Sequence, residues 1–192
     1  MKLVIIKYNA GNSQSVLFAL KRLGVQAIIS NNAEEILSAD KLIFPGVGEA
    51  ATAMRFLKEN KLDKIILAAQ QPFLGICLGM QLLCRHSEEG DTDGLGIFDC
   101  HVKKFAGDLK IPHMGWNEVE ETKNPLFRNV INQPFYFVHS YYAELCNQTV
   151  GVTDYGIRFS SALQKDNFYG VQFHTEKSGT AGETVLKNFL SL

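Results

Sequence analysis

The chain has 192 residues, of which 46% are hydrophobic and 20% charged, and its formal net charge is −1. This composition is typical of a globular protein, and the length suits one compact domain over 1–192 with a sizeable buried core. The near-neutral charge, without long runs of one sign, argues against nucleic acid or a membrane as a partner. The N-terminal apolar run is short and contains Lys7. We therefore expect neither a signal peptide nor a membrane span, and a cytoplasmic location.

Four cysteines are present and none belongs to a CxxC motif: Cys77, Cys84, Cys100 and Cys146. The absence of that spacing argues against a zinc site or a thioredoxin-like motif. We expect reduced thiols, with the last three acting as small buried hydrophobic residues. The context of Cys77 is different and is taken up below.

The first half of the chain predicts strands that alternate with helices. A strand at 3–8 precedes a helical pattern at 11–24, which Asn12 or Ser13 could cap and Gly24 would end. Further strands are predicted at 25–30, 41–44 and 72–76, with a helix at 49–60 and a helix-like run at 78–86. Short apolar strands alternating with helices predict a mostly parallel sheet flanked by helices, an α/β fold.

The second half predicts mainly strands separated by turn residues, followed by an amphipathic helix at 182–192. The strand-like stretches are 96–105, 116–121, 135–145, 149–156, 157–167 and 168–174. Closely spaced strands with turns between them favour antiparallel pairing. We therefore expect an antiparallel extension of the sheet in the C-terminal half.

The stretch GICLGMQ at 75–81 places Cys77 between a predicted strand and a predicted helix. A reactive side chain on such a tight turn is a nucleophile elbow, and glycines on both sides allow close backbone approach. The partial positive charge at a helix N-terminus favours a thiolate. An ordinary buried cysteine at a βα turn remains the alternative from this stretch alone.

Two further stretches could complete a catalytic site. His174 and Glu176 end a predicted strand, and side chains two residues apart project to one side of an extended backbone. A carboxylate there could orient the imidazole as the base for a thiol. The sequence PGVG at 45–48 follows another strand and could offer backbone N–H groups beside the nucleophile. A surface turn and a plain glycine-rich loop are the respective alternatives.

Taken together, PGVG, GICLGMQLL and GVQFHTEKS resemble the motifs of class I (triad-type) glutamine amidotransferases, in this order and over nearly the whole chain. The resemblance implies that Cys77 attacks the side-chain amide of glutamine, with His174 as base and Glu176 as its orienter. It also implies that no metal and no organic cofactor takes part. For substrate binding it implies an oxyanion hole and glutamine contacts from Val47, Gly48, Leu78, Gln81, Glu89, Ser140 and Tyr141.

Narrower motifs, YNAGNSQSV, PHMGWN and FYFVHSYY, resemble the glutaminase subunits of imidazole glycerol phosphate synthases, which serve histidine biosynthesis. This resemblance implies a heterodimer with a separate (β/α)8-barrel cyclase subunit, to which ammonia passes without reaching water. The cyclase would make imidazole glycerol phosphate and an aminoimidazole carboxamide ribotide. Trp116, Asn117 and Tyr136 resemble residues on the side that faces the cyclase, although Trp116 could equally be a core aromatic.

Two positions depart from the family pattern. Thr175 stands where the family usually has proline, and Lys7 stands where an acidic residue is common. Threonine neither fixes φ nor removes an N–H, so the turn could be less rigid, but the spacing of His174 and Glu176 is kept.

Three other functions remain open at this stage. One is a glutaminase subunit that serves pyridoxal phosphate or GMP synthesis. The second is a catalytically silent, partner-binding relative, which the intact triad argues against. The third is a cysteine peptidase or stress-response protein on a similar sheet, which would lack the paired PGVG and VQFHTEKS motifs.

Overall fold

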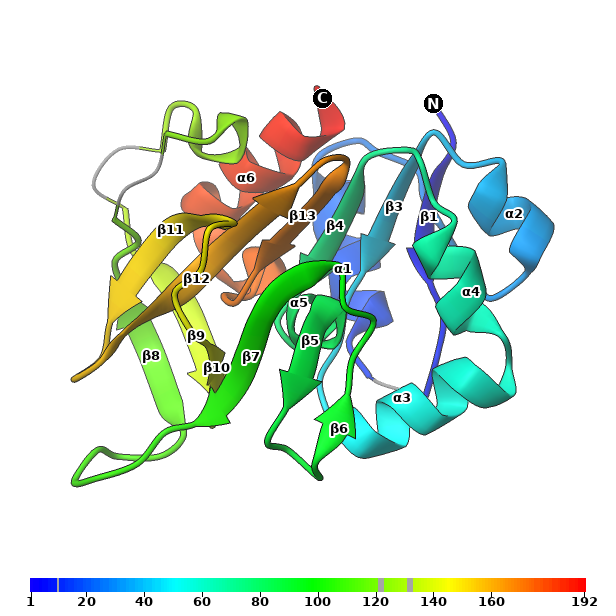
Figure 1. The fold of residues 1–192 in the computed structure, drawn as a ribbon. Helices are drawn as coiled ribbons and strands as arrows, with labels where there is room; N and C mark the ends of the chain where they lie inside the picture. The colour runs from blue at the N-terminus through cyan, green and yellow to red at the C-terminus, as the bar shows by residue number, and fades with distance from the viewer. Residues whose placement is uncertain (10, 121–122, 131–132) are drawn as a thin grey trace.

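The computed structural model describes residues 1–9, 11–120, 123–130 and 133–192. Within them a central sheet of eleven strands has the order β2-β1-β3-β4-β13-β12-β10-β7-β5-β6, with β11 paired to β12 (Figure 1). Its strands are β1 (Leu3–Ile6), β2 (Ile28–Ser30), β3 (Lys41–Phe44), β4 (Phe73–Ile76), β5 (Cys84–Ser87), β6 (Thr92–Asp93), β7 (Phe98–Lys104), β10 (Tyr141–Ala143), β11 (Thr149–Asp154), β12 (Arg158–Lys165) and β13 (Phe168–Val171).

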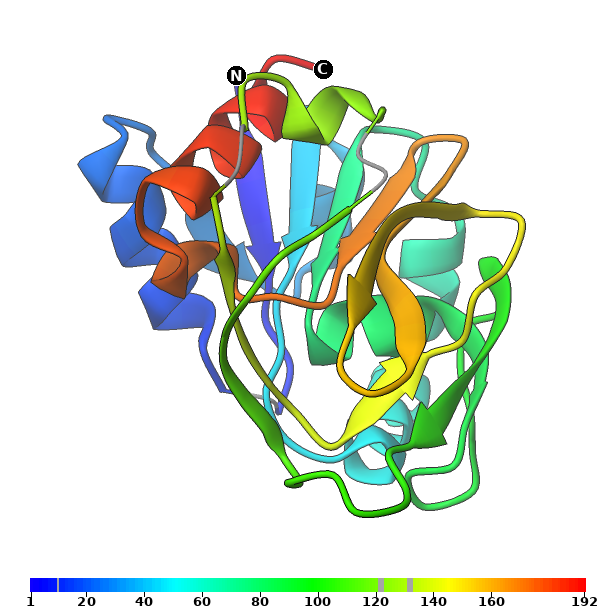
Figure 2. The same ribbon diagram turned by 90° about the vertical axis from the view of Figure 1, so that its left-hand side faces the viewer.

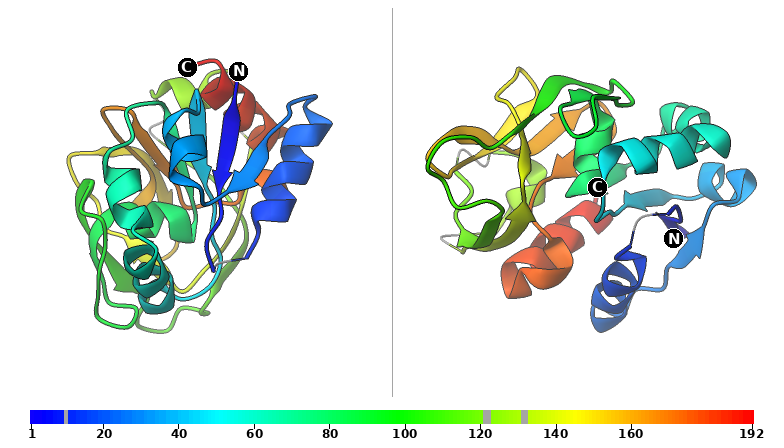
Figure 3. Two further views of the ribbon diagram at one scale, coloured as in Figure 1. Left: turned by 90° about the vertical axis from the view of Figure 1, so that its right-hand side faces the viewer. Right: turned by 90° about the horizontal axis from the view of Figure 1, so that it is seen from below.

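The remaining elements cover this sheet. A two-stranded antiparallel sheet is formed by β8 (His113–Asn117) and β9 (Phe135–His139). The helices are α1 (Ser13–Arg22), α2 (Ala33–Leu37), α3 (Ala50–Glu59), α4 (Leu62–Leu67), α5 (Leu78–Leu83) and α6 (Gly179–Leu190), with 3-10 turns η1 (Pro125–Phe127) and η2 (Thr175–Lys177). Both chain ends lie at the same end of the molecule (Figures 1 and 3).

Strand pairing follows the predicted division between the two halves of the chain. The five neighbouring strands β2, β1, β3, β4 and β13 are parallel to one another. Beyond β13 the pairs β13–β12, β12–β10 and β10–β7 are antiparallel, as is β5–β6, while β5–β7 is parallel. The expected α/β fold, a mostly parallel sheet with an antiparallel extension, is confirmed.

Alternating apolar residues bury both faces of the parallel strands. On β1, Val4 and Ile6 join a core with α3, α4 and α5, whereas Leu3 and Ile5 join a second core with α1 and α6. The second core also contains residues of β9 from the small sheet. Figure 2 shows this small sheet beside α6, on one side of the molecule. Because successive side chains point to opposite faces, continuously apolar strands can only be sandwiched between two layers.

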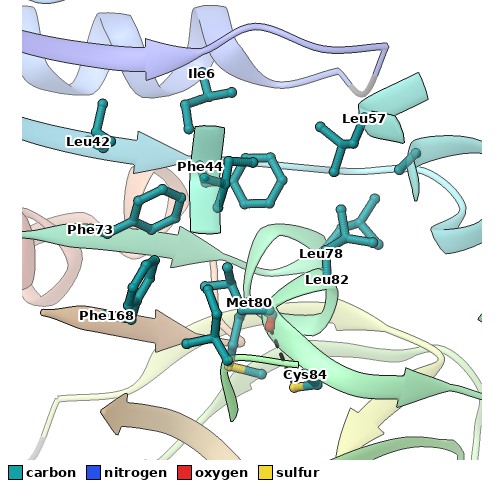
Figure 4. Close-up of a cluster of buried hydrophobic side chains, with 14 of the residues drawn as sticks. Ile6, Leu42, Phe44, Leu57, Phe73, Leu78, Met80, Leu82, Cys84 and Phe168 are labelled. Carbon is teal, nitrogen blue, oxygen red and sulfur yellow. Dashed lines mark hydrogen bonds between the residues drawn. The ribbon is translucent and has the colours of Figure 1, made fainter. Parts of the chain in front are cut away.

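The first core packs around α5, the helix that follows Cys77. Figure 4 shows Leu78, Met80 and Leu82 of this helix with the aromatic side chains of the neighbouring strands, all of them buried. The rings of Phe44 and Phe73 stand edge to face at 5.9 Å, and those of Phe73 and Phe168 are tilted toward each other at 5.0 Å. Packing of this density fixes the position of α5 relative to the ends of β3 and β4.

The helix predicted at 78–86 is shorter than expected. It ends at Leu83, because Cys84 turns extended and begins β5, which pairs with β7 through Cys84 and Phe98. A run of helix-forming residues gives no sign of this long-range pairing.

The predicted strand at 135–145 is in fact two strands in different sheets. β9 ends at His139, and β10 begins at Tyr141 in the main sheet. The chain therefore crosses from one layer to the other at Ser140. Aromatic and apolar residues typical of strands continue on both sides of Ser140, so the sequence pattern alone does not reveal the crossing.

Other predicted strands also differ in extent, and three of them differ by three residues or more at one end or both. The strand at 168–174 ends at Val171, the strand at 25–30 begins only at Ile28, and β8 ends at Asn117. Glu120 forms only an isolated bridge with Val152, and residue 121 of the predicted 116–121 strand lies outside the described residues. In the described part of the chain, no helix has the length and apolar character needed to cross a membrane.

Gly79 is required by the close packing of α5 on β3. A Cβ built at this position would lie 1.8 Å from the Phe44 carbonyl oxygen, which is backbone and cannot move aside. Overpacking of this kind costs about 1–3 kcal/mol. We expect Gly79→Ala to lower the free energy of unfolding by at least that amount in chemical denaturation, whereas Gln14→Ala, an exposed change on α1, should be nearly neutral. Equal stabilities of the two variants would contradict this packing.

Candidate active site

Cys77 occupies a strained turn between β4 and α5. Its φ is 54° and its ψ −114°, a backbone conformation that residues with a Cβ rarely adopt. Its N–H donates to the Val171 carbonyl at 2.8 Å, and its own carbonyl accepts from the Gln81 N–H at 3.1 Å. A side chain held in this way at the carboxyl end of a central strand has the geometry of a nucleophile elbow.

His174 and Glu176 meet directly behind this turn. The His174 Nδ1–H donates to Glu176 Oε1 at 2.8 Å, and both side chains are fully buried. The prediction that they share one side of an extended strand is wrong, because residues 175–177 form the 3-10 turn η2 and His174 is its N-cap. The tight turn brings the carboxylate back toward the ring, so the two side chains meet without extended backbone.

Electrostatics make His174 a strong base. Burial opposes the charged imidazolium, but the neighbouring Cys77 sulfur and the Glu176 carboxylate outweigh it and raise the pKa of His174 to about 10. Burial likewise opposes ionisation of Glu176, but its contacts with His174 and Asn12 lower its pKa. The opposite ring nitrogen, Nε2, is buried without a hydrogen-bond partner among the described residues. An imidazole held this way can accept the proton of a neighbouring thiol.

Asn12 is a member of this cluster that the sequence analysis did not assign to it. Asn12 rather than Ser13 is the N-cap residue of α1, one of the two positions predicted, but its side chain makes no capping hydrogen bond. Its Nδ2 instead donates to Glu176 Oε1 and lies 3.4 Å from His174 Nδ1. The backbone of Asn12 has φ of 85°, which aims the side chain away from the helix. Asn12 thus holds the carboxylate that accepts the hydrogen bond from His174.

A cavity of about 170 Å³ opens over the nucleophile, lined by Val47, Gly48, Cys77, Leu78, Gln81, Val138, His139, Ser140 and Tyr141. All the predicted substrate-binding residues except Glu89 line it. Gln81 Nε2 donates to the Tyr141 carbonyl at 2.8 Å and to Gln172 Oε1 at 2.9 Å. Gln172 Nε2 in turn donates to Cys77 Sγ at 3.6 Å. Gln172 is a second residue that sequence reasoning missed, although it lies within the quoted GVQFHTEKS motif.

The loop at 45–48 lies beside Cys77, as predicted, and is held by Tyr8. The Tyr8 hydroxyl donates to the Pro45 carbonyl at 2.7 Å, and a Cβ on Gly46 would lie 2.1 Å from that hydroxyl. The Leu78 N–H donates to the Gly46 carbonyl at a long 3.4 Å. Gly48 has φ of 130°, a value that only glycine adopts readily. The Leu78 donor is therefore directed at the loop itself in this structure.

Glu89 lies away from the cavity. Its Oε2 accepts from the Ala50 N–H at 2.8 Å at the start of α3, and burial raises its pKa. In this structure it holds the N-terminus of a helix, and its predicted contact with substrate stays a prediction.

The three residues predicted to face a partner lie on the small sheet. Trp116 is 57% exposed and packs edge to face against Tyr136 at 5.8 Å, so the alternative of a core aromatic is wrong. The Tyr136 carbonyl accepts from the His174 N–H at 2.9 Å. The Asn117 side chain donates to the Asp154 carbonyl at 2.9 Å.

The two departures from the family pattern have mild structural effects. Thr175 is buried at the first position of η2, where an N–H has no partner within the turn, so threonine and proline are both compatible with the backbone. Lys7 is exposed. Residue 10, within the quoted YNAGNSQSV motif, lies outside the described residues.

Asn12→Ala is expected to slow alkylation of Cys77 by iodoacetamide about tenfold at neutral pH, because hydrogen bonds to charged groups contribute about 1.5–3 kcal/mol. Without the amide, Glu176 is less well held and His174 is a weaker base for the thiol. Asn12→Asp should slow the reaction further, since it places a second carboxylate beside Glu176. The matched control is Ser13→Ala on the same turn. Alkylation of Asn12→Ala at the control's rate would exclude the positioning role.

Comparison with known proteins agrees with this geometry. Residues 4–192 match the family model for "Glutamine amidotransferase class-I". The chain is 57% identical to "Imidazole glycerol phosphate synthase subunit HisH" of Bacteroides fragilis strain YCH46 and 50% identical to the protein of that name from Pectobacterium atrosepticum, with both chains covered in full in each case.

Solved structures show the same fold at low sequence identity. A glutamine amidotransferase superposes with a TM-score of 0.78 at 18% identity, covering 100% of this chain and 98% of its own. A glutamine amidotransferase from Thermotoga maritima gives 0.63 at 19% identity, covering 100% and 81%. With the family model matched over nearly its whole length, the chain belongs to the class I glutamine amidotransferases.

Proposed function

We propose that this chain is the glutaminase subunit of an imidazole glycerol phosphate synthase, one domain over 1–192 that works in the cytoplasm. It hydrolyses L-glutamine to L-glutamate and supplies the ammonia to a cyclase subunit in histidine biosynthesis. The observation that carries this proposal is the Cys77 turn, which faces a cavity on one side and the His174–Glu176 pair on the other. Relatives named for this synthase, 57% and 50% identical over full length, support the pathway.

The reaction follows from the position of each group. His174 takes the thiol proton, and Cys77 Sγ attacks the carbon of the glutamine side-chain amide. The amide carbon–nitrogen bond then breaks, His174 returns the proton to the leaving nitrogen, and ammonia departs. The glutamyl thioester that remains is hydrolysed by a water molecule that His174 deprotonates, which yields glutamate and restores the thiol. Glu176 keeps Nδ1 protonated throughout, so Nε2 is the nitrogen that exchanges the proton.

Backbone N–H groups near Val47, Gly48 and Leu78 are the proposed oxyanion hole. The long hydrogen bond from the Leu78 N–H to the Gly46 carbonyl occupies one of these donors. The loop must therefore turn the Gly46 carbonyl away before the Leu78 donor can serve an oxyanion. Loss of one such donor costs about 10²–10³ in rate, so the loop could hold the enzyme nearly idle until its partner is loaded.

The cavity provides the proposed contacts for glutamine. Gln81 and the backbone of Ser140 and Tyr141 line it and could meet the polar ends of the substrate, with the carboxylate near Ser140. Glu89 is the proposed partner of the α-ammonium group. Because its carboxylate now bonds to the N–H of Ala50, this contact would need Glu89 to exchange that bond for the substrate.

The exposed face of β8 is the proposed contact with a (β/α)8-barrel cyclase in a heterodimer. Met114 and Trp116 point to the same side of β8, and each is 57% exposed. Apolar side chains exposed together on a sheet are typical of interaction surfaces. Tyr136, beside Trp116, is one hydrogen bond from His174, so the proposed interface lies directly behind the catalytic base. Ammonia released at Cys77 would therefore leave the site near the proposed interface with the partner.

The identity to relatives named for imidazole glycerol phosphate synthase favours this pathway over pyridoxal phosphate or GMP synthesis. The assembled pair of His174 and Glu176 behind Cys77 argues against a catalytically silent relative.

The decisive experiment measures glutamate formation from glutamine with the chain alone and with a histidine-pathway cyclase plus its ribotide substrate. We expect strong stimulation by the loaded cyclase, which Cys77→Ala abolishes and Cys146→Ala, a change at a half-buried thiol outside the site, leaves in place. High activity that ignores this cyclase would move the glutaminase to another pathway. A lack of Cys77-dependent activity under both conditions would favour the partner-binding alternative.

Gly48→Pro tests the loop at 45–48. Proline fixes φ near −65° and has no N–H, whereas Gly48 has φ of 130° and a proposed donor role. We expect the stimulated rate to fall by about 10²-fold or more and the ratio of stimulated to unstimulated rate to change. The stimulated rate of Val47→Ala, which keeps both backbone N–H groups, should fall much less. Wild-type rates of Gly48→Pro in both states would exclude a gating loop.

A further inference from the structure

Two buried histidines form a hydrogen-bonded pair beside the glutamine cavity. His113 Nδ1 lies 3.0 Å from His139 Nε2, and His139 Nδ1 lies 2.7 Å from the Tyr141 carbonyl oxygen. At the outer end, Asn117 Nδ2 lies 3.4 Å from His113 Nε2. None of these contacts belongs to the triad. The chain of contacts runs from β8 in the small sheet to the wall of the cavity.

The partners fix the protonation of both rings. A carbonyl oxygen can only accept, so His139 must carry its proton on Nδ1. Burial lowers the pKa of His139 to about 3 despite its bond to the Tyr141 carbonyl, so Nε2 is an acceptor at neutral pH. His113 must then donate from Nδ1, and burial, which lowers its pKa to about 4, leaves its Nε2 as an acceptor for Asn117. Each hydrogen bond of this series therefore has its donor on the Asn117 side and its acceptor on the Tyr141 side.

Aromatic side chains surround the buried pair. The His113 ring stacks on Tyr155 at 4.0 Å and on Phe137 at 4.9 Å. The His139 ring packs on Phe105 and Phe159, each at 5.3 Å. His113 and His139 are 3% and 6% exposed. In such surroundings a lost hydrogen bond leaves a buried polar atom without a partner, at a cost in free energy. The hydrogen bonds of the pair therefore restrict the orientation of both rings.

The Tyr141 carbonyl is where the pair meets the glutamine site. This oxygen accepts from His139 Nδ1 and also from Gln81 Nε2, so both of its lone pairs are used. Gln81 Nε2 also donates to Gln172 Oε1, and Gln172 Nε2 donates to Cys77 Sγ. The chain passes from the small sheet to the main sheet at Ser140, directly before Tyr141. Residues 138–141 of this segment line the cavity. The orientation of one carbonyl therefore decides the shape of the cavity wall and the place of Gln81.

We propose that His113 and His139 are positioning residues, a neutral pair with both protons on Nδ1, which hold the Tyr141 carbonyl and thereby shape the glutamine site. This proposal deepens the proposed function and rests on it for the identity of the substrate. Because the pair is anchored on β8, a partner that shifts the small sheet would change the cavity through the same bonds.

The first test reads the tautomers directly in the wild-type protein. Long-range ¹H–¹⁵N correlation spectra of histidine-labelled chain distinguish a protonated from an unprotonated Nδ1. We expect both rings to be neutral with Nδ1–H at neutral pH, whereas free neutral histidine prefers Nε2–H. A proton on Nε2 of His139 would overturn the proposal, whatever the enzyme's substrate or partner proves to be.

The second test measures KM for glutamine in the complex of the chain with its cyclase. His139→Leu should raise KM about tenfold, the cost of one lost bond of this strength, with a smaller change in kcat. His139→Asn, whose amide places a donor near the position of Nδ1, should restore most of the affinity. His139→Gln places its donor near Nε2 and should not. The matched control is His101→Leu, at an exposed histidine on β7.

His113→Phe distinguishes the hydrogen bonds of His113 from its packing, because phenylalanine keeps the aromatic stack and removes both ring nitrogens. It should raise KM less than His139→Leu, and the double variant should be no worse than His139→Leu alone, as expected for residues that act in series. Additive effects, an unchanged KM in His139→Leu, or equal values for His139→Asn and His139→Gln would each overturn the proposal. Wild-type complex without Cys77-dependent glutaminase would instead refute the proposed function, and the tautomer measurement would still decide the structural claim.

Discussion

The strained backbone of Cys77, with a positive φ of 54°, is the constraint on which the rest of the site depends. A non-glycine residue in such a conformation costs about 1–3 kcal/mol and persists only where its surroundings hold it. Here the hydrogen bonds from Cys77 to Val171 and from Gln81 to Cys77 fix the turn on both sides. Gly75 and Gly79 let α5 fold back onto β4 and β3, because a Cβ at either would meet backbone atoms at 2.9 Å and 1.8 Å. The glycines that flank the thiol therefore serve the packing that maintains its strain.

The parallel order of the central strands then gathers the other groups around this turn. β3, β4 and β13 are neighbours and run in the same direction, so their carboxyl ends meet at one edge of the sheet. β3 delivers the loop at 45–48, β4 delivers Cys77, and β13 leads to Gln172 and His174. The end of β1 adds Tyr8 and Asn12. Functional groups from separate parts of the chain are adjacent because the strands that carry them end at the same edge. Ligand sites of such sheets form at this edge.

The sequence predicted those features that are encoded locally. The apolar strands of the first half and the glycines around Cys77 depend on residues close together in the chain. Asn12 was assigned to a helix cap because its real partner, Glu176, is 164 residues away. The early end of α5 and the crossing at Ser140 likewise depend on pairing with distant strands, which local periodicity does not report. Gln172 was within a recognised motif, but only the fold shows that its amide points at the nucleophile.

The other cysteines differ from Cys77 in their surroundings rather than in residue type. Cys84 and Cys100 are in contact at 3.4 Å within the core. Although the contact with Cys146 opposes it, the contact with Cys84 and burial raise the pKa of Cys100 well above its usual range. The contact with Cys100 and burial do the same to Cys146. The raised pKa values keep the thiols of Cys100 and Cys146 protonated and therefore poor nucleophiles. Cys77 is buried like Cys84 and Cys100, whereas Cys146 is only half-buried, but Cys77 faces a basic imidazole and lines a cavity. The fold therefore distinguishes Cys77 from the other three thiols by the titratable groups that it places beside it.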